Sequence, residues 1–377
     1  MKKLGFLLTL VAALGLLIGL PVKAQAQESI KIGVMAPRTG DWASEGQDMI
    51  KVVELLAEQL NAAGGINGAK VEVVVEDDQG MPRTASLAAK KLITAGVVAV
   101  VGTYGSSITE ASQADYDEAK VLQVATGSTS VRLTEKGLKL FFRTCPRDDE
   151  QGRVLAENIK KLGFRKVAIV HDNTSYSKGL ADETRALFQQ DQEMTEVFYD
   201  SITPGDQDYS ATLTKIKAAS PDVIVFTGYY PEAAMILRQK HDMDWNVAMI
   251  GGDATNNLDL VVIAGNQAAS GYYFVSPPAL KEMTTDSAKK FSVDYETKYK
   301  SQPSSVWAVL AGDAFSVIVE SIKAVGADSE KMAQWLKTDF KNYEGFSGPI
   351  SFNQIGDRVG EVYRLYTVNS EGQYIIQ

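Results

Sequence analysis

The sequence predicts an α/β fold made of two lobes, each a parallel sheet covered by helices on both faces. Short apolar segments alternate with amphipathic helical segments along most of the chain, a pattern typical of parallel sheets. These units come in two successive runs of four or five. Without its first 26 residues the chain keeps 351 of its 377 residues, a length for which two domains are the natural expectation.

The first run begins with an alternating strand pattern, and its first helix has apolar residues at a spacing of three or four. We expect strands over residues 29–35, 71–76, 97–101 and 121–125. Helices are expected after a polar loop at 37–46, from Pro82, and from the serine pair at 106–107. They should end near residues 63, 95 and 119, and the first one meets a glycine pair that fits a C-terminal cap.

The second run has the same character, and only the tail breaks the alternation. We expect strands over residues 166–171, 196–199, 222–226 and 246–250, and helices near 148–161, 177–190, 207–219 and from 231 onward. In the tail we expect a strand at 271–275, three helices at 283–300, 304–325 and 329–339, and hairpin-like strands at 348–352 and 362–368. Three helices without intervening strands do not continue a β-α alternation.

The first 26 residues have the pattern of a secretory signal peptide. Lys2 and Lys3 precede an apolar segment at 4–20, and Ala24 and Ala26 satisfy the small-residue rule for cleavage. We therefore expect cleavage after Ala26 and export. No later segment has the roughly 18 apolar residues that a membrane helix needs. The single cysteine, Cys145, leaves no intramolecular disulfide.

Charge and motif content exclude several classes of function. Cleavage removes three lysines and leaves 35 basic against 47 acidic residues, a net charge of −12 that argues against nucleic acid or an anionic membrane as partner. With two histidines and one cysteine, the chain has no nucleophile elbow, dinucleotide-binding fingerprint or zinc-protease motif. We expect a binding protein rather than an enzyme, with no cofactor and no metal.

Residues 97–112 hold the most informative single segment. A buried strand at 97–101 is followed by Gly102 and Gly105, and a helix should begin at Ser106, with Glu110 placed for a capping box. A helix start offers unpaired N–H groups and partial positive charge, and so it can bind a carboxylate or a phosphate. In open α/β sheets such sites lie beyond the carboxyl ends of the strands. The alternative is an ordinary capped helix.

Several motifs in family order resemble those of leucine/isoleucine/valine-type periplasmic binding proteins. They are NAAGGING at 61–68, EDD at 76–78, GTYGSS at 102–107, IVHD at 169–172, GYYPE at 228–232 and GP at 348–349. The likeness covers the whole chain after the signal peptide. It implies the type I solute-binding component of an ABC importer, located in the periplasm, monomeric, with a small amino acid as ligand and a membrane permease as partner.

The resemblance also implies the domain organisation. Two doubly wound parallel-sheet lobes would be joined by three crossovers, with the ligand in the cleft between them. The N-terminal lobe would comprise residues 27–146 and 276–347, and the C-terminal lobe residues 147–275 and 348–377. Binding would proceed by hinge closure, because a ligand that touches both lobes stabilises the closed state.

The family's ligand-binding positions carry chemically suitable residues here. Ser106 matches the serine that binds the ligand carboxylate, while Thr129 and the Gly127 carbonyl match the strand-end partners of the ligand. Tyr176 and Tyr229 match aromatics that close over the ligand, and Asp253 stands where an acid pairs with the ammonium group. Asp253 is shorter than the usual glutamate.

Other positions depart from the leucine-type pattern. Tyr104 and Glu45 replace residues that often line the side-chain pocket, and Trp42 lies three residues before Glu45. A larger ring and an extra acid would shrink the pocket or admit a polar or cationic side chain. A disulfide found in some members is absent, because its two loops carry Gly80 and Gly105.

Each assignment has a structural alternative. The hydroxyl residues could cap helices, the tyrosines could be packing aromatics, and Asp253 could be a turn residue. Trp307 is interpreted as a core residue of its helix. The functional alternatives are an amide, urea or small aromatic acid as ligand, or a sensor that reports ligand to a receptor.

Overall fold

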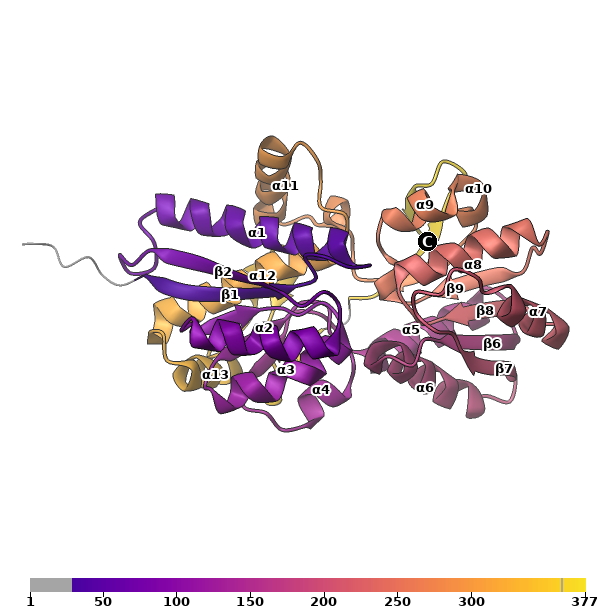
Figure 1. The fold of residues 1–377 in the computed structure, drawn as a ribbon, viewed down its shortest axis with the longest axis horizontal. Coiled ribbons are helices and arrows are strands. Elements are labelled where there is room, and N and C mark those ends of the chain that lie inside the picture. Colours follow the sequence, from indigo (N-terminus) through magenta and orange to yellow (C-terminus); the bar gives the residue numbers. More distant parts are fainter. Residues whose placement is uncertain (1–28, 361) are drawn as a thin grey trace, which may run out of the picture.

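The computed structural model describes residues 29–360 and 362–377, which form two lobes lying side by side, each with its own main sheet (Figure 1). The predicted signal peptide lies outside the described residues. The sheet of the first lobe has the order β2-β1-β3-β4-β5, and every neighbouring pair is parallel. Its strands are β1 (Ile30–Ala36), β2 (Val71–Asp77), β3 (Ala99–Val101), β4 (Leu122–Ala125) and β5 (Phe141–Arg143).

The sheet of the second lobe has the order β14-β13-β10-β9-β8-β6-β7. Its strands are β6 (Lys166–His171), β7 (Thr195–Ser201), β8 (Val223–Phe226), β9 (Ala248–Gly251), β10 (Tyr273–Ser276), β13 (Arg364–Val368) and β14 (Tyr374–Ile376). The five strands from β7 to β10 are parallel, and β13 and β14 add an antiparallel edge. The predicted α/β class with two parallel sheets is confirmed.

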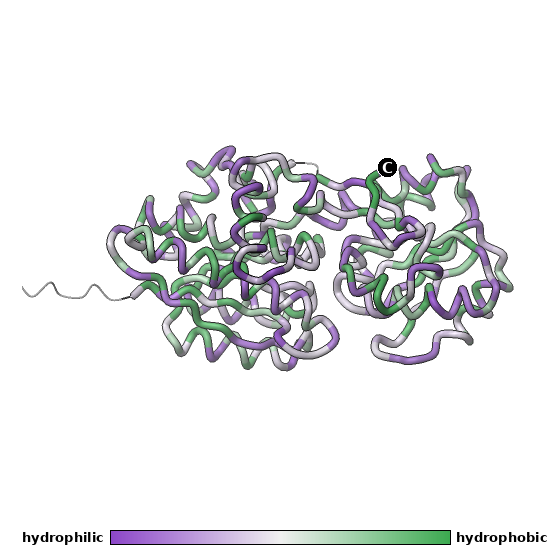
Figure 2. The backbone as a smooth tube through the Cα atoms, turned by 90° about the horizontal axis from the view of Figure 1, so that it is seen from above, coloured by the Kyte–Doolittle hydropathy of each residue, from purple (hydrophilic) through white to green (hydrophobic). Residues whose placement is uncertain are grey.

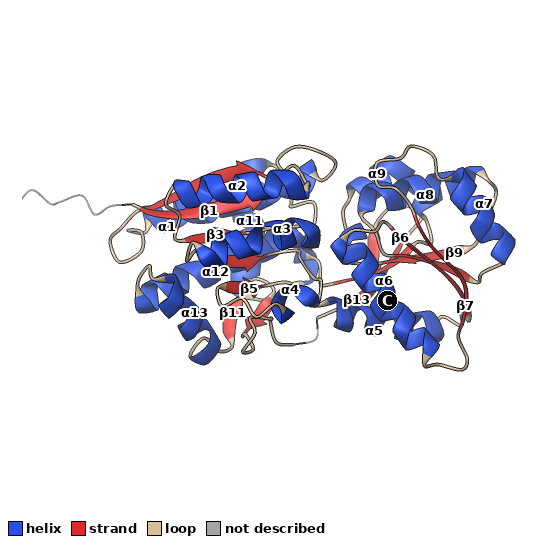
Figure 3. Cartoon of the chain, turned by 60° about the horizontal axis from the view of Figure 1, so that its bottom comes forward, coloured by secondary structure: helices blue, strands red, loops and turns tan. Residues whose placement is uncertain are grey.

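Helices cover both faces of each main sheet (Figure 3). They are α1 (Ala43–Ala62), α2 (Pro82–Thr94), α3 (Ser106–Glu118), α4 (Arg132–Glu135), α5 (Asp148–Lys161), α6 (Ser175–Gln189), α7 (Ser210–Ala219), α8 (Tyr230–Asp242), α9 (Asp259–Ala264), α10 (Asn266–Ala269), α11 (Asp286–Tyr299), α12 (Val306–Val325) and α13 (Ser329–Thr338). Short 3₁₀ turns occur at Asp253–Thr255 and Leu280–Glu282. Within the described residues, no helix combines the length and the apolarity required to cross a bilayer.

The chain passes between the two lobes three times. The first passage follows β5, the second follows β10, and the third lies between Ile350 and Arg364. The predicted hairpin of residues 348–352 with 362–368 is wrong. Strand β12 (Gly348–Ile350) pairs instead with β11 (Tyr343–Gly345), and β13 joins β10 of the second lobe.

Helix α12 forms the centre of the first lobe's core. Most of its residues are buried, and it packs against α1, α13, β3 and β4. Such a uniformly apolar helix is stable only where neighbours cover it on all sides. Figure 2 shows apolar segments running through the interior of both lobes.

Three local predictions near the first sheet need correction. Helix α1 begins at Ala43, inside the predicted loop at 37–46, and so Glu45 lies in its first turn. Strand β3 is shorter than the predicted 97–101 segment. Strand β5 was not predicted, because two phenylalanines followed by Arg143 form too short an apolar run to indicate a strand.

Candidate functional site

The predicted ligand-binding residues follow the carboxyl ends of strands in both lobes. In the first lobe they lie after β1, β3 and β4, and in the second lobe they lie after β6, β8 and β9. This is where ligands bind in open α/β sheets. The structure brings the nine residues into one connected group at the boundary between the lobes. Its members are Trp42, Glu45, Tyr104, Ser106, Gly127, Thr129, Tyr176, Tyr229 and Asp253.

Four aromatic rings form the centre of this group. Trp42 stacks on Tyr229 across the lobe boundary, with ring centroids 4.2 Å apart. Tyr104 meets Trp42 edge-on at 5.5 Å and Tyr229 at 5.8 Å, and Tyr176 lies 5.3 Å from Tyr229. Aromatic pairs at these separations are attractive beyond the area that they bury. Rings of the two lobes therefore contact each other directly.

Trp42 lies where the loops carrying Gly80 and Gly105 come together. A Cβ atom on Gly105 would lie 2.9 Å from the indole ring, and one on Gly80 would lie 2.8 Å from it. Only glycine leaves room for the ring at these two positions. The indole thus packs against both loops.

The end of β4 supplies polar groups beside the start of α3. The Oγ of Ser106 accepts a hydrogen bond from the backbone N–H of Ser130 at 3.1 Å. The buried Oγ1 of Thr129 has no hydrogen-bond partner in the described part of the chain. The predicted capping box is wrong, because Gly105 is the N-cap of α3 and Glu110 forms ion pairs with Arg132 and Lys136. The hydroxyl of Ser106 therefore lies in the first turn, next to the unpaired N–H groups.

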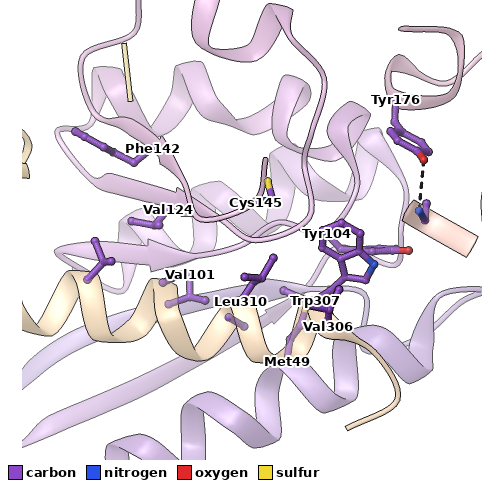
Figure 4. Close-up of a cluster of buried hydrophobic side chains, with 14 of the residues drawn as sticks. Met49, Val101, Tyr104, Val124, Phe142, Cys145, Tyr176, Val306, Trp307 and Leu310 are labelled. Atoms are coloured by element: carbon purple, nitrogen blue, oxygen red, sulfur yellow. Dashed lines mark hydrogen bonds between the residues drawn. The ribbon is translucent and has the colours of Figure 1, made fainter. Parts of the chain in front are cut away.

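Asp253 lies at the end of β9 and is fully buried. Its Oδ2 accepts a hydrogen bond from the Tyr363 hydroxyl at 2.6 Å, and its backbone N–H donates to Gln151 Oε1 at 2.8 Å. The Tyr176 hydroxyl donates to Gln151 Oε1. The same hydroxyl accepts a hydrogen bond from the Ala254 N–H, the dashed line at Tyr176 in Figure 4. Burial raises the pKa of Asp253 to about 7, although the hydrogen bond from Tyr363 favours the ionised form.

Asp148 is a second buried acid that the sequence reasoning missed. It opens α5, its backbone N–H donates to the Thr129 carbonyl at 3.0 Å, and its Oδ2 has no partner among the described residues. Burial, followed by the charge of Asp253, raises the pKa of Asp148 well above its ordinary value. The sequence signal was ambiguous, because acids are common in the first turn of any helix.

Glu45 is buried beside Ser305 rather than exposed in an open pocket. Its Oε1 accepts from Asn257 Nδ2 at 2.6 Å, and its Oε2 accepts from the Ser305 hydroxyl at 2.5 Å. Burial raises the pKa of Glu45 to about 8, against the effect of both hydrogen bonds. Asn257 belongs to the second lobe. Its hydrogen bond to Glu45 therefore joins the two lobes through residues that are 212 positions apart in the sequence.

Further contacts hold the two lobes together around this group. The Tyr230 hydroxyl donates to the Asp41 carbonyl at 2.8 Å and lies 3.2 Å from Ser44 Oγ. On the other side of the group, the Arg132 guanidinium donates to Ser175 Oγ at 2.9 Å. With the Glu45–Asn257 bond, these contacts describe a closed arrangement of the lobes.

A cleft of about 500 Å³ opens from the group toward solvent and is lined by both lobes. Trp42 and Tyr229 reach its wall, and the other predicted side chains are buried behind them. A neighbouring hollow of about 480 Å³ is lined by Ser130, Asp148 and Gly179 among others. Among residues 29–360 and 362–377, no group of three or more His, Cys, Asp and Glu side chains could hold a metal ion.

Arg143 holds the loop that follows β4 in place. It is fully buried, and its Nε donates to Asp357 Oδ1 at 2.6 Å. Its Nη1 donates to the carbonyls of Ser128 and Ser130, and its Nη2 to Thr134 Oγ1. Burial alone would raise the pKa of Asp357, but Arg143 and Arg147 hold it below its ordinary value. The guanidinium thus fixes the loop on both sides of Thr129.

Comparison with known proteins gives one consistent result. Residues 29–373 match the family model described as periplasmic binding protein. The chain is 36% identical over 335 residues to the Leu/Ile/Val-binding protein homolog 3 of Brucella melitensis, covering 88% of this chain and 89% of that protein. It is 32% identical over 346 residues to the leucine-, isoleucine-, valine-, threonine-, and alanine-binding protein of Pseudomonas aeruginosa, covering 91% of each.

A solved structure agrees with these relatives. The branched-chain amino acid transporter substrate binding protein LivJ of Streptococcus pneumoniae, in complex with isoleucine, has a TM-score of 0.84 at 30% identity. The match covers 93% of this chain and 100% of that chain. Sequence and fold thus point to the same group of proteins.

Proposed function

Because this chain belongs to the periplasmic binding protein family, we propose that it is the solute-binding component of an ABC importer and binds a small amino acid between its two lobes. The names of its relatives support an amino acid, and branched-chain amino acids recur among them. The ligand-bound protein would deliver its amino acid to a membrane permease. Family membership likewise supports binding without catalysis.

The observation that carries this proposal is the separation of donors and acids within the site. The Ser106 hydroxyl and the N–H groups at the start of α3 can bind a carboxylate, and Thr129 Oγ1 lacks a close hydrogen-bond partner among the described residues. The buried acids Asp148 and Asp253 can bind an ammonium group. A zwitterionic amino acid satisfies both sets, whereas an amide, urea or aromatic acid offers no ammonium. Each charge-assisted hydrogen bond stabilises the complex by about 1.5–3 kcal/mol.

Contacts between the lobes support binding by hinge closure. Trp42 meets Tyr229, Glu45 meets Asn257 and Arg132 meets Ser175 only when the lobes are together. A ligand that touches both lobes favours this state by its differential affinity for it. The lobes that we propose comprise residues 27–146 and 147–275, each completed by part of the tail. We place the last boundary between β12 and β13, because β12 pairs with β11.

The family also supports a periplasmic location, and we propose export with cleavage after Ala26. The protein would act as a monomer, because a single chain supplies both walls of the cleft.

A thermal-shift screen tests the proposed function. The mature protein is stripped of ligand by unfolding and refolding, then mixed with each natural amino acid, small amides and aromatic acids. An amino acid at 100 times its Kd should stabilise the protein by about 2.7 kcal/mol, which raises Tm by a degree or more. The matching amide and decarboxylated amine should give no shift. A shift only with ligands that lack an ammonium group would contradict the proposal.

Affinity for the amino acid should depend on pH. The pKa of Asp253 is about 7 in the protein, and a bound ammonium group should lower it, so binding below pH 7 must release a proton. Affinity should therefore be constant above pH 7 and fall about tenfold per pH unit below it, until the pKa of the complex is reached. Calorimetry between pH 5.5 and 8.5 measures the Kd of the amino acid as a function of pH. The variant Asp253→Asn should lose the part of this pH dependence that we assign to Asp253. A wild-type Kd independent of pH would exclude Asp253 as the ammonium partner.

A further inference from the structure

Two buried aromatic donors of the first lobe, beside the proposed ligand, have no hydrogen-bond partner within the described residues, and the Tyr229 hydroxyl of the second lobe is a third such donor. The two donors of the first lobe are the indole Nε1 of Trp307 and the hydroxyl of Tyr104, in side chains that are each 1% exposed. An indole N–H can only donate, and a buried donor without an acceptor is destabilising. The amino-acid backbone of the ligand does not account for them, because Ser106, Thr129 and the buried acids already match its two charges.

The two donors lie close together. Their rings are 6.1 Å apart, and in Figure 4 the Tyr104 hydroxyl and the Trp307 nitrogen point to the same side of the view. Tyr104 comes from the loop after β3, and Trp307 from the first turn of α12. Tyr104 also contacts Tyr229 of the second lobe at 5.8 Å. Both donors therefore lie at the lobe boundary, next to the position proposed for the ligand.

No group in the described part of the chain accepts a hydrogen bond from these donors. The two oxygens of Glu45, on the same lobe, accept from Asn257 and Ser305 instead. Burial raises the pKa of Tyr104 well above its ordinary value, and so its hydroxyl keeps its proton and can donate. The side-chain end of the site therefore offers two donors and an acid whose oxygens are already hydrogen-bonded.

We propose that the ligand side chain carries an uncharged oxygen acceptor, a hydroxyl or an amide carbonyl, that accepts hydrogen bonds from Trp307 Nε1–H and Tyr104 Oη–H. This inference rests on the proposed function and narrows its ligand from small amino acids in general to those with a short polar side chain. An anionic side chain is disfavoured, because Asp253, which is ionised when it pairs with the ammonium group, lies close to Tyr104. A purely aliphatic side chain would leave both donors unpaired.

Isosteric amino acids provide the test. Isothermal titration calorimetry of the ligand-stripped mature protein compares threonine with valine and asparagine with leucine, pairs that share their shape and differ in the polar group. At least one polar member should bind about tenfold or more tightly than its isostere. Trp307→Phe and Tyr104→Phe remove one donor each and keep a ring, and each should bring that ratio to within about threefold of unity. Trp335→Phe, a half-buried tryptophan on α13, is the control and should leave the ratio unchanged.

The outcomes separate this inference from the proposed function. A preference below tenfold in both pairs, or a ratio that survives Trp307→Phe and Tyr104→Phe, overturns the inference alone while amino-acid binding stands. If no natural amino acid binds, the proposed function is overturned and the inference with it. The two single variants are independent, so one of them still decides the question if the other fails to fold.

Discussion

Asp253→Asn is expected to weaken amino-acid binding by about 2–5 kcal/mol, roughly 30- to 5,000-fold in Kd. The buried ammonium group would lose its acid, and a charge without a partner is costly in a site that excludes water. The fold should tolerate the change. Asparagine keeps an oxygen that can accept from Tyr363, and it resembles the protonated acid that a pKa of about 7 already populates. Calorimetry gives the Kd, and thermal unfolding without ligand gives the stability.

A matched change at the surface controls for the loss of one negative charge. Asp242 is exposed at the end of α8 in the same lobe. The variant Asp242→Asn should leave the Kd for the amino acid unchanged within about twofold. Equal affinities for Asp253→Asn and Asp242→Asn would remove Asp253 from the site. A large loss of Tm in Asp253→Asn would instead assign it a structural role.

Arg143→Met is expected to lower the free energy of unfolding by about 3–5 kcal/mol. The change leaves Asp357, only 2% exposed, with Arg147 as its remaining cationic partner. It also leaves the carbonyls of Ser128 and Ser130 without the guanidinium that binds them. A buried charge that loses its partner costs more than the pair contributes when intact. Urea denaturation of the ligand-free protein measures the effect.

The control for this prediction is Lys323→Met. Lys323 forms an exposed ion pair with Glu320 one turn away on α12, and losing such a pair costs at most about 1 kcal/mol. Equal stabilities of the two variants would show that Arg143 does not anchor the loop. If Arg143 positions Thr129, its variant should also bind the ligand more weakly than the Lys323 variant at a temperature where both are folded.

Local sequence patterns predicted most of the regular structure. The bounds of α5 and β6 agree with the prediction to the residue, because their apolar spacing and flanking breaks depend only on nearby positions. Strand β5 and the β11–β12 hairpin could not be predicted in the same way. Two phenylalanines and an arginine give no strand pattern, and the partner of β12 is chosen by packing.

Some residues of the candidate site could be predicted from the sequence, and others could not. Ser106 could be identified from the sequence pattern, because a helix start at the carboxyl end of a strand can bind an anion, whereas Thr129 and Asp253 were implied by the family resemblance. Asp148 and Trp307 could not be identified, because their importance depends on burial and on the absence of a nearby partner. Tyr363 lies 110 positions from Asp253, and no local signal connects them.

The sequence by itself determined the class of fold and most of the alternating strands and helices, since these follow from periodicity and turn chemistry over a few residues. Tertiary structure alone decided which acids are buried, which donors lack partners and which bonds join the lobes. The physical reason is that desolvation and hydrogen-bond pairing depend on everything that surrounds a group in space. Glu45 illustrates this: burial within the fold raises the pKa of its carboxyl to about 8, although a hydrogen bond from Asn257, 212 positions away, favours the ionised form.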